Sequence, residues 1–266
     1  YLPWAYCGAL WALSVLLASL SVLPAAAQSA TERPQIVDFR PVAAKSLPAP
    51  GDICTLHPGP ANAQTRILRR PSTYGKAATA TFEVEYNGFS PEAREAFQRA
   101  VDIWETHVRS SQPIKISANY TTLEPGVLGS AGSSQLWFGT TDDGEQSIYP
   151  DALIDALIDG NAAEQDGDPS NDDEPDIVAR FSDQVDWYFG PPPPEGPGPT
   201  PGQIDFTTVV LHEIGHGLGF FGSMRVDGLQ GSWGFGTSDP TVPAIYDRFA
   251  ENENAAEMKK SRPRTS

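Results

Sequence analysis

The chain has 266 residues, a formal net charge of −16 and a sequence pI near 4.5. Phosphate binding needs a basic face, so this acidic balance excludes nucleic acid as an expected partner. Hydrophobic residues make up 39% of the chain, which is enough for the core of one sizeable domain with extensions.

The first 27 residues form an uncharged apolar stretch that ends in Pro24 and three alanines. An apolar run that closes on small residues is typical of a secretory signal, so we expect a signal peptide over residues 1–27, cut after Ala27. The alternative is an uncleaved membrane anchor, because the stretch is long enough to span a bilayer. Cleavage predicts a secreted, periplasmic or cell-surface protein that has no stable membrane association afterwards.

Residues 28–75 are rich in Pro, Ala and Arg and show little periodicity, so they predict a pro-segment or an extended N-terminal arm. Cys7 lies in the signal, so the mature chain keeps only Cys54 and forms no internal disulfide. A thiolate in a pro-segment can block an open metal position, which makes Cys54 a candidate latency thiol. The alternatives are a free thiol or a pair with a cysteine beyond this chain.

Residues 76–266 predict one domain in which strands and helices are mixed. Residues 81–86 alternate apolar and polar side chains, as a half-buried strand does. A helix should follow Ser90, because Ser90 can cap it and Pro91 suits its first position. The apolar face expected for this helix repeats every 3.6 residues and comprises Ala93, Phe97, Ala100, Val101, Trp104 and Val108.

The following residues predict two more strands, at 114–120 and 176–181, and a short helix at 152–158. Residues 121–150 show no strong pattern, and the Pro- and Gly-rich residues 190–202 predict an irregular loop. A further helix should begin at Phe206 or Thr207, with Asp205 as its cap.

This last helix carries His212, Glu213 and His216. Two histidines four residues apart lie on the same side of a helix, so both imidazoles can bind one Zn²⁺. Glu213, next to the first histidine, can reach a metal-bound water and act as the general base. The alternative is a pair of surface histidines on a capped helix, since short motifs also arise by chance.

The sequence around these residues, His-Glu-Ile-Gly-His-Gly-Leu-Gly-Phe from His212 to Phe220, resembles the active-site helix of the zincin metallopeptidases, on the metzincin side. Gly219 matches the glycine that breaks that helix three residues after the second histidine. Residues 82–249 resemble secreted bacterial metallopeptidases. The resemblance implies a zincin-like α+β catalytic domain, with a twisted mixed sheet, a long helix and an active-site helix.

One position departs from this pattern. The metzincin pattern places its third metal ligand, His or Asp, at the position occupied here by Gly222, and no histidine follows His216. A downstream carboxylate is one replacement, and a water or an upstream group are the others. We favour Asp247, which is flanked by aromatic residues, with Asp227 as the second choice. Asp247 can instead pair with Arg248 or cap a turn.

Two further segments lead to expectations. The acidic residues between Asp166 and Asp176 can bind Ca²⁺ through their oxygens or form a solvated loop. The polar and then basic tail, residues 251–266, carries no core pattern and is expected to be irregular. Because the proteins that the chain resembles continue further, we expect a truncated or frameshifted C-terminus.

The sequence therefore predicts a secreted zinc metalloendopeptidase that acts on proteins or peptides. The main alternative is a catalytically inactive zincin-like protein that binds protein or glycan. A second alternative is a cell-surface protein in which zinc only stabilises the fold. The sequence predicts neither the cleaved bond nor the oligomeric state.

Overall fold

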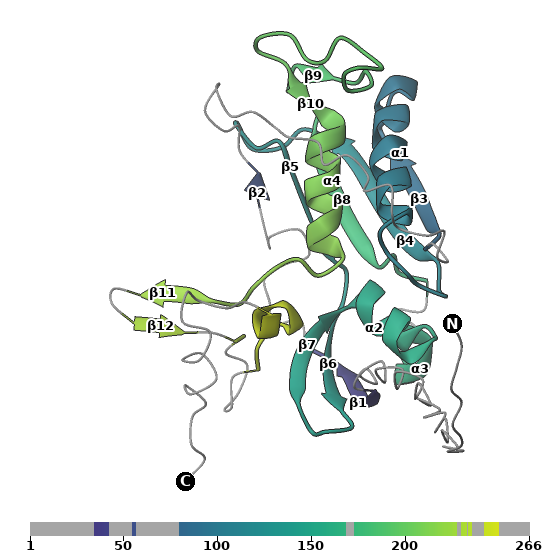
Figure 1. The fold of residues 1–266 in the computed structure, drawn as a ribbon, viewed down its shortest axis with the longest axis vertical. Coiled ribbons are helices and arrows are strands. Elements are labelled where there is room, and N and C mark those ends of the chain that lie inside the picture. Colours follow the sequence, from purple (N-terminus) through teal and green to yellow (C-terminus); the bar gives the residue numbers. More distant parts are fainter. Residues whose placement is uncertain are drawn as a thin grey trace, which may run out of the picture. The chain divides into compact units, whose positions relative to one another are not determined.

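The computed structural model describes residues 35–42, 55–56, 80–168, 173–227, 230–232, 234–235 and 242–249. The elements in these residues belong to one compact unit, Pro34–Ser266, and combine helices with parallel and antiparallel strands (Figure 1). The fold is therefore α+β, as expected. The predicted signal peptide and the C-terminal tail lie outside the described residues.

The largest sheet has five strands in the order β2–β5–β8–β4–β3. The strands β3, β4 and β8 run parallel, whereas β5 is antiparallel to β8, and β2 is antiparallel to β5. In chain order they are β2 (Thr55–Leu56), β3 (Phe82–Asn87), β4 (Ile114–Thr121), β5 (Gly129–Ser133) and β8 (Ile177–Ser182).

Two helices, α1 (Pro91–Glu105) and α4 (Phe206–Gly217), cover one face of this sheet. They lie side by side in Figure 1, and the Trp104 indole of α1 donates a hydrogen bond of 3.1 Å to the Leu211 carbonyl of α4. The shared core contains the sheet residues Ile116 and Ala179 and the Phe206 ring at the start of α4. Aromatic rings pack edge-on around Phe206, with the Trp187 ring centroid at 5.0 Å.

A second sheet has the order β1–β6–β7 and is antiparallel throughout. Short helices and a 3-10 turn accompany it, and two pairs of very short strands lie before and after α4. These elements are β1 (Ile36–Pro41), β6 (Leu136–Thr141), β7 (Gln146–Pro150), α2 (Asp151–Ile158), α3 (Ala162–Asp166), β9 (Trp187–Tyr188), β10 (Ile204–Asp205), β11 (Arg225–Asp227), β12 (Gln230–Ser232) and η2 (Ile245–Phe249).

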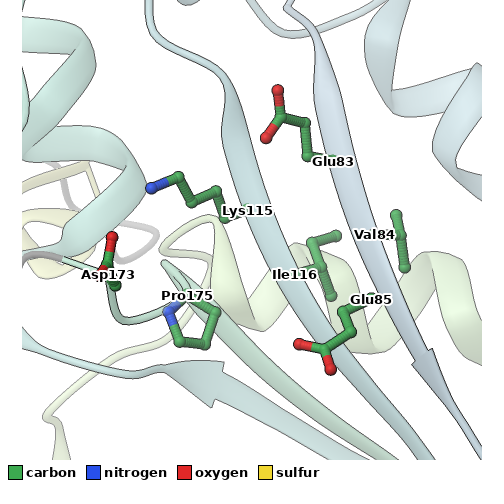
Figure 2. A pocket seen from close by; sticks show the side chains of 7 residues that line it. All are labelled: Glu83, Val84, Glu85, Lys115, Ile116, Asp173 and Pro175. Carbon is green, nitrogen blue, oxygen red and sulfur yellow. The ribbon is translucent and has the colours of Figure 1, made fainter.

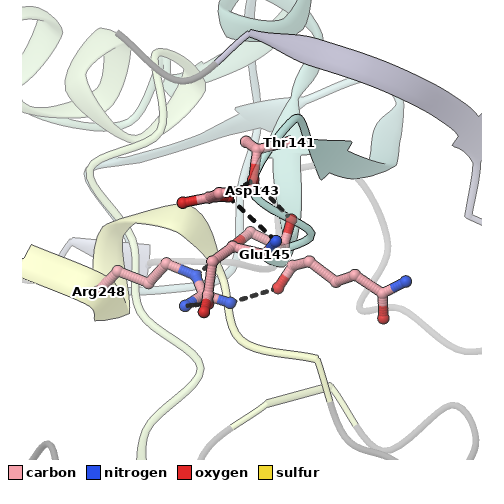
Figure 3. A network of polar contacts seen from close by, with 6 residues as sticks. Thr141, Asp143, Glu145 and Arg248 are labelled. Carbon is pink, nitrogen blue, oxygen red and sulfur yellow. Dashed lines mark hydrogen bonds and ion pairs between the residues drawn. The ribbon is translucent and has the colours of Figure 1, made fainter. Parts of the chain in front are cut away.

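The 3-10 turn η2 is fixed to the β6–β7 hairpin by a polar network (Figure 3). The Arg248 guanidinium pairs with the Glu145 carboxylate at 2.5 Å and donates to the Gln146 carbonyl and the Ser147 hydroxyl. Asp143 completes the hairpin turn by accepting from the Glu145 amide at 3.2 Å. Residues about one hundred positions apart in the sequence are thereby held together.

Most predicted elements are confirmed. The strand at 81–86, the helix after Ser90, the strands at 114–120 and 176–181 and the short helix near 152–158 correspond to β3, α1, β4, β8 and α2. Ser90 caps α1 by accepting from the Ala93 amide at 3.2 Å. The residues at 190–202 form no helix or strand, as expected.

Two parts of the fold differ from what the sequence pattern suggested. Residues 121–150, which show no strong periodicity, form β5, β6 and β7. Part of the expected N-terminal arm, Ile36–Pro41, pairs with β6 as a strand that has one register shift between Ile36 and Asp38, and Thr55–Leu56 pairs with β5. The arm therefore contributes two strands to the sheets. Among the described residues, no helix has the length and apolar character needed to cross a membrane.

Candidate metal centre

The helix α4 carries the predicted histidines and begins as the sequence predicts. Asp205 caps it, its carboxylate accepting from the Thr208 amide at 3.2 Å. The Thr207 hydroxyl donates to the Ala96 carbonyl of α1 at 3.0 Å. The helix is therefore fixed at its start by its own cap and along its side by α1, which makes it a rigid support for the site.

Glycines bring the C-terminal half of α4 close to its neighbours. A Cβ atom on Gly217 would lie 2.5 Å from Ile177 Cγ2 of β8, so only glycine permits this approach. The helix ends at Gly217, and Gly219 adopts a φ of +108°, which favours glycine. The expected break at Gly219 is confirmed.

The two histidines point toward each other. The Nε2 atoms of His212 and His216 lie 3.0 Å apart, and the ring planes are inclined at 85°. His216 Nδ1 lies 2.8 Å from the Phe220 carbonyl oxygen, so Nδ1 carries the proton and donates it there. This tautomer leaves His216 Nε2 as an acceptor or a metal donor.

The histidine geometry fits a zinc ion. Two nitrogens at about 2.0–2.1 Å from one tetrahedral ion lie about 3.3 Å apart, close to the 3.0 Å between the Nε2 atoms. Burial, followed by the proximity of His216, lowers the pKa of His212, which favours the neutral imidazole that binds metals. The same distance also suits a hydrogen bond from His212 to His216, so the contact is compatible with both metal-bound and metal-free histidines.

Glu213 is fully buried beside β5, and among the described residues neither of its carboxylate oxygens has a well-aligned hydrogen-bond partner; the Ala131 amide is the nearby donor. Burial raises the pKa of Glu213 to about 7, and the nearby Ala131 amide of β5 partly opposes this shift. A buried polar group without a partner is costly, and such groups occur where function requires them. A carboxyl group with this pKa can accept and release a proton near neutral pH.

Asp247 lies in η2 and is only 2% exposed. Its carboxylate accepts hydrogen bonds from the amide and hydroxyl of Ser223 and from the Ala244 amide, the last at 3.0 Å. Among the described residues, Asp247 forms no cluster with His212 and His216 in which the ligand atoms lie within 4.8 Å of one another. The structure therefore gives Asp247 the turn-capping contacts that the sequence left open as its alternative role.

The other predicted site residues have no described side chains. Asp227 ends strand β11, but only its backbone is described. Cys54 lies outside the described residues, directly before β2. The predicted roles of Asp227 as a metal ligand and of Cys54 as a latency thiol stay predictions.

A second cluster of potential ligands was not predicted as a group. Oxygens of Asp151, Asp155 and Asp176 lie within 4.8 Å of one another, and all three residues are buried. Burial is the main cause that raises their pKa values, to about 8 for Asp151, about 7 for Asp155 and about 6 for Asp176. The charge of Asp176 adds to the shifts of Asp151 and Asp155. We refer to these three residues as the aspartate triad.

A signal for the triad is visible in the sequence. Asp151 and Asp155 are spaced by four residues in the segment Asp-Ala-Leu-Ile-Asp-Ala-Leu-Ile, so both carboxylates lie on one side of α2. Asp176 belongs to the acidic run for which Ca²⁺ was one expectation. Its contact with Asp151 and Asp155 depends on how β8 and α2 pack, which sequence spacing does not reveal.

The sheet face opposite α1 and α4 has two surface hollows. One, of about 410 Å³, is lined by β3, β4 and the residues before β8, with Lys115 among the acidic side chains Glu83, Glu85 and Asp173 (Figure 2). The other, of about 450 Å³, is lined by residues of β3, β4 and β8 and the turn after β3. Neither hollow is lined by α4, so neither belongs to the histidine site.

Comparisons with known proteins give one match. Residues 126–249 match the family model described as SPBPB7E8-like. This segment is 124 of the 266 residues and runs from just before β5 to η2, so it contains the histidine pair, Glu213 and the aspartate triad. No curated protein and no solved structure matches the chain.

Proposed function

We propose that this chain is a secreted zinc-dependent peptidase with a zincin-like catalytic domain. The observation that carries the proposal is the convergence of two imidazole Nε2 atoms, 3.0 Å apart, on the helix that also buries the unpartnered carboxylate of Glu213. A structural role explains a capped helix with surface histidines, but it does not explain a fully buried carboxylate whose nearest donor among the described residues is one poorly aligned backbone amide, that of Ala131.

His212 and His216 would hold the ion, with water or a carboxylate outside the described residues completing the coordination. When bound, Zn²⁺ acts as a Lewis acid that acidifies a water and polarises the substrate carbonyl. Glu213 accepts the proton of the attacking water on a carboxylate oxygen and passes it to the leaving amine. Its pKa of about 7 suits both transfers, and burial keeps the carboxylate away from competing solvent.

The second candidate is a catalytically inactive binding or cell-surface protein. One observation favours it: among the residues that the structure describes, the histidine pair has no third ligand. A catalytic zinc normally has three protein ligands, so two alone would bind zinc weakly.

The test combines metal analysis with a peptide-library assay on the mature chain. We expect zinc in the wild-type protein and in Glu213→Gln, and a fall in cleavage of about 10²–10⁴-fold in that variant, which is the usual contribution of a general base. Glu95→Gln, an exposed carboxylate on α1, is the matched control and should keep full activity. His212→Ala should lose both zinc and cleavage.

The alternatives give different results. A protein that contains zinc but cleaves nothing supports a structural metal. A protein that takes up no divalent metal supports the inactive binding role. Cleavage that is unchanged by Glu213→Gln would contradict the proposed role of this carboxylate.

A further inference from the structure

The residues directly after α4 are tied to η2 by a single buried carboxylate. Asp247 accepts from the Ser223 amide with both oxygens, at 3.0 and 3.1 Å, and also from the Ser223 hydroxyl. Through the Ala244 amide it closes its own turn at the same time. The Ser223 hydroxyl in turn accepts from the Gly234 amide at 2.7 Å. Asp247 therefore joins the Ser223 segment directly to η2, and the segment of Gly234 is joined to them through the Ser223 hydroxyl.

Gly222 makes this contact possible. A Cβ atom on Gly222 would lie 2.8 Å from Asp247 Oδ1, which is shorter than a van der Waals contact between carbon and oxygen. Oδ1 is held there by the hydrogen bond from the Ser223 amide. The position that carries a ligand side chain in the pattern the sequence resembles is thus occupied here by backbone that packs on Asp247. The absence of a side chain at Gly222 therefore leaves the space that the Asp247 carboxylate occupies.

The same segment fixes the second histidine. The Phe220 carbonyl, three residues before Ser223, accepts from His216 Nδ1 at 2.8 Å. The Phe220 amide donates back to the Gly215 carbonyl at 3.0 Å, and the Phe220 ring lies against Tyr246, with centroids 6.0 Å apart. Residues 220–223 are therefore contacted at both ends by η2: Tyr246 packs on Phe220, and Asp247 accepts from Ser223.

We propose that Asp247 is a positioning residue: it holds residues 220–223 so that the Phe220 carbonyl keeps His216 protonated on Nδ1, with Nε2 directed at His212. An acceptor behind a metal-binding histidine sets the tautomer and orientation of the ring, and its loss typically lowers metal affinity about 10–100-fold. The consequence for metal binding rests on the proposed function, but the effect on the imidazole does not.

The first experiment needs no metal. Nitrogen-15 NMR of histidine-labelled, chelator-treated protein distinguishes the Nδ1–H from the Nε2–H tautomer at one fixed pH. We expect His216 in the Nδ1–H form in the wild type, a shift toward the Nε2–H form in Asp247→Ala, and the wild-type form in Asp247→Asn. Asparagine keeps an oxygen that can accept from the Ser223 and Ala244 amides, so the conservative change should rescue the effect.

The second experiment measures Co²⁺ binding by competition and by visible absorption. For a positioning residue, Asp247→Ala should weaken Co²⁺ about 10–100-fold with an unchanged absorption spectrum, and Asp247→Asn should bind within a few-fold of the wild type. For a metal ligand, both variants should weaken binding alike and change the absorption spectrum. That second result would overturn the proposal.

Two further variants keep the test decisive if Asp247→Ala does not fold. Gly222→Ala displaces the carboxylate from the other side, and Ser223→Ala removes one of its donors; both should shift the His216 tautomer. Asp142→Asn, an exposed aspartate in the β6–β7 hairpin, is the matched control. A wild type that binds no Co²⁺ but shows these tautomer shifts refutes the peptidase proposal alone, whereas an unchanged tautomer in every variant refutes the role of Asp247.

Discussion

Two glycines inside α4 differ in what surrounds them. A Cβ atom on Gly217 would lie 2.5 Å from Ile177, whereas one on Gly215 would make an ordinary contact of 3.4 Å with the Trp104 ring. The glycine between the histidines is thus replaceable on steric grounds, and the glycine after the second histidine is not. Both positions carry the same residue in the motif, and only the packing of the helix separates them.

This difference predicts opposite effects on stability. Gly217→Ala should destabilise the protein by about 1–3 kcal/mol through overpacking against Ile177. Gly215→Ala should be neutral or stabilising by up to about 1 kcal/mol, because alanine favours a helix interior. Urea denaturation of both variants gives the comparison, and a double-mutant cycle with Ile177→Ala should show that the Gly217 and Ile177 changes cost less together than the sum of their separate costs. Equal stability of the two single variants would show that α4 does not approach β8 this closely.

At the scale of elements, the N-terminal arm affects the two sheets differently. Strand β1 pairs with β6 over most of its length, and its residues Ile36 and Phe39 pack on the core cluster around Trp137. Strand β2 contributes two residues to the edge of β5, the strand whose Ala131 amide lies near Glu213. The first contact completes a small sheet, whereas the second covers the sheet edge next to the candidate metal centre.

Two truncations separate these roles. A chain that starts at residue 43 lacks β1, which leaves one edge of β6 unpaired and removes Ile36 and Phe39 from the core cluster around Trp137, so we expect a clear loss of thermal stability. A chain that starts at residue 57 also lacks β2 and should lose little more stability but expose the β5 edge, where an extended peptide can add as a strand. Under the proposed function, its peptidase activity should exceed that of the chain starting at residue 43.

The control is a chain that starts at residue 35, which keeps both strands and should match the full mature protein in stability. Thermal unfolding and the peptide assay are the measurements. If the two shorter chains have equal activity, β2 does not restrict access to the site.

Helix caps and the alternation of apolar and polar residues correctly predicted the helices and the strand in which they occur. Ser90 and Asp205 mark the starts of α1 and α4, and the alternation after Thr81 marks β3, because capping and strand periodicity depend on neighbouring residues alone. The histidine pair was predicted for the same reason, since one helical turn sets its spacing. The role of Asp247 was left open because its partner Ser223 lies 24 positions away in the sequence and is brought to it only by the packing of η2.

The strands between Gly129 and Pro150 were missed for a different reason. β5 consists of Gly, Ser and Ala, and all five of its residues are buried, so it shows no alternation. Its place is set by close pairing with β8, where a Cβ atom on Gly129 would lie only 3.0 Å from the Phe181 ring. The pairing of β1 with β6 joins residues about one hundred positions apart, which sequence periodicity does not predict.

At the scale of the whole molecule, the acidic side chains are not confined to the surface. The aspartate triad concentrates three carboxyl groups in the interior, and the Lys115 charge lowers the pKa only of Asp155 and Asp176. Each raised pKa means that the folded state binds protons more tightly than the unfolded chain does. The triad therefore favours folding fully below about pH 4 and loses this contribution as the pH rises through about 6 to 8.

This linkage predicts how stability depends on pH. In chelator-treated protein, we expect the melting temperature to fall between pH 5 and pH 8 by at least about 2–4 °C, which corresponds to about 1 kcal/mol for a domain of this size. Asp151→Asn should flatten the profile because it removes the group with the highest pKa of the three. Calorimetry at several pH values measures both effects.

Added Ca²⁺ at pH 8 distinguishes a triad that shares protons from one that holds a cation. If the triad binds Ca²⁺, the ion should restore the melting temperature of the wild type but not that of Asp151→Asn. The exposed Asp183→Asn serves as control. A melting temperature that rises with pH in the chelated wild type would contradict the raised pKa values.

The three-stranded sheet also has a kinetic consequence. It joins Ile36–Pro41 to the hairpin at Leu136–Pro150, and Ala244 and Arg248 then bind that hairpin from the far end of the described chain. Contacts between such distant segments form slowly, because long loops must close before any contact is gained. We therefore expect this sheet to assemble last during refolding. A chain synthesised only as far as α4 would still lack the Arg248 contacts that hold the hairpin, so this region should stay open to proteases until the residues of η2 have been synthesised.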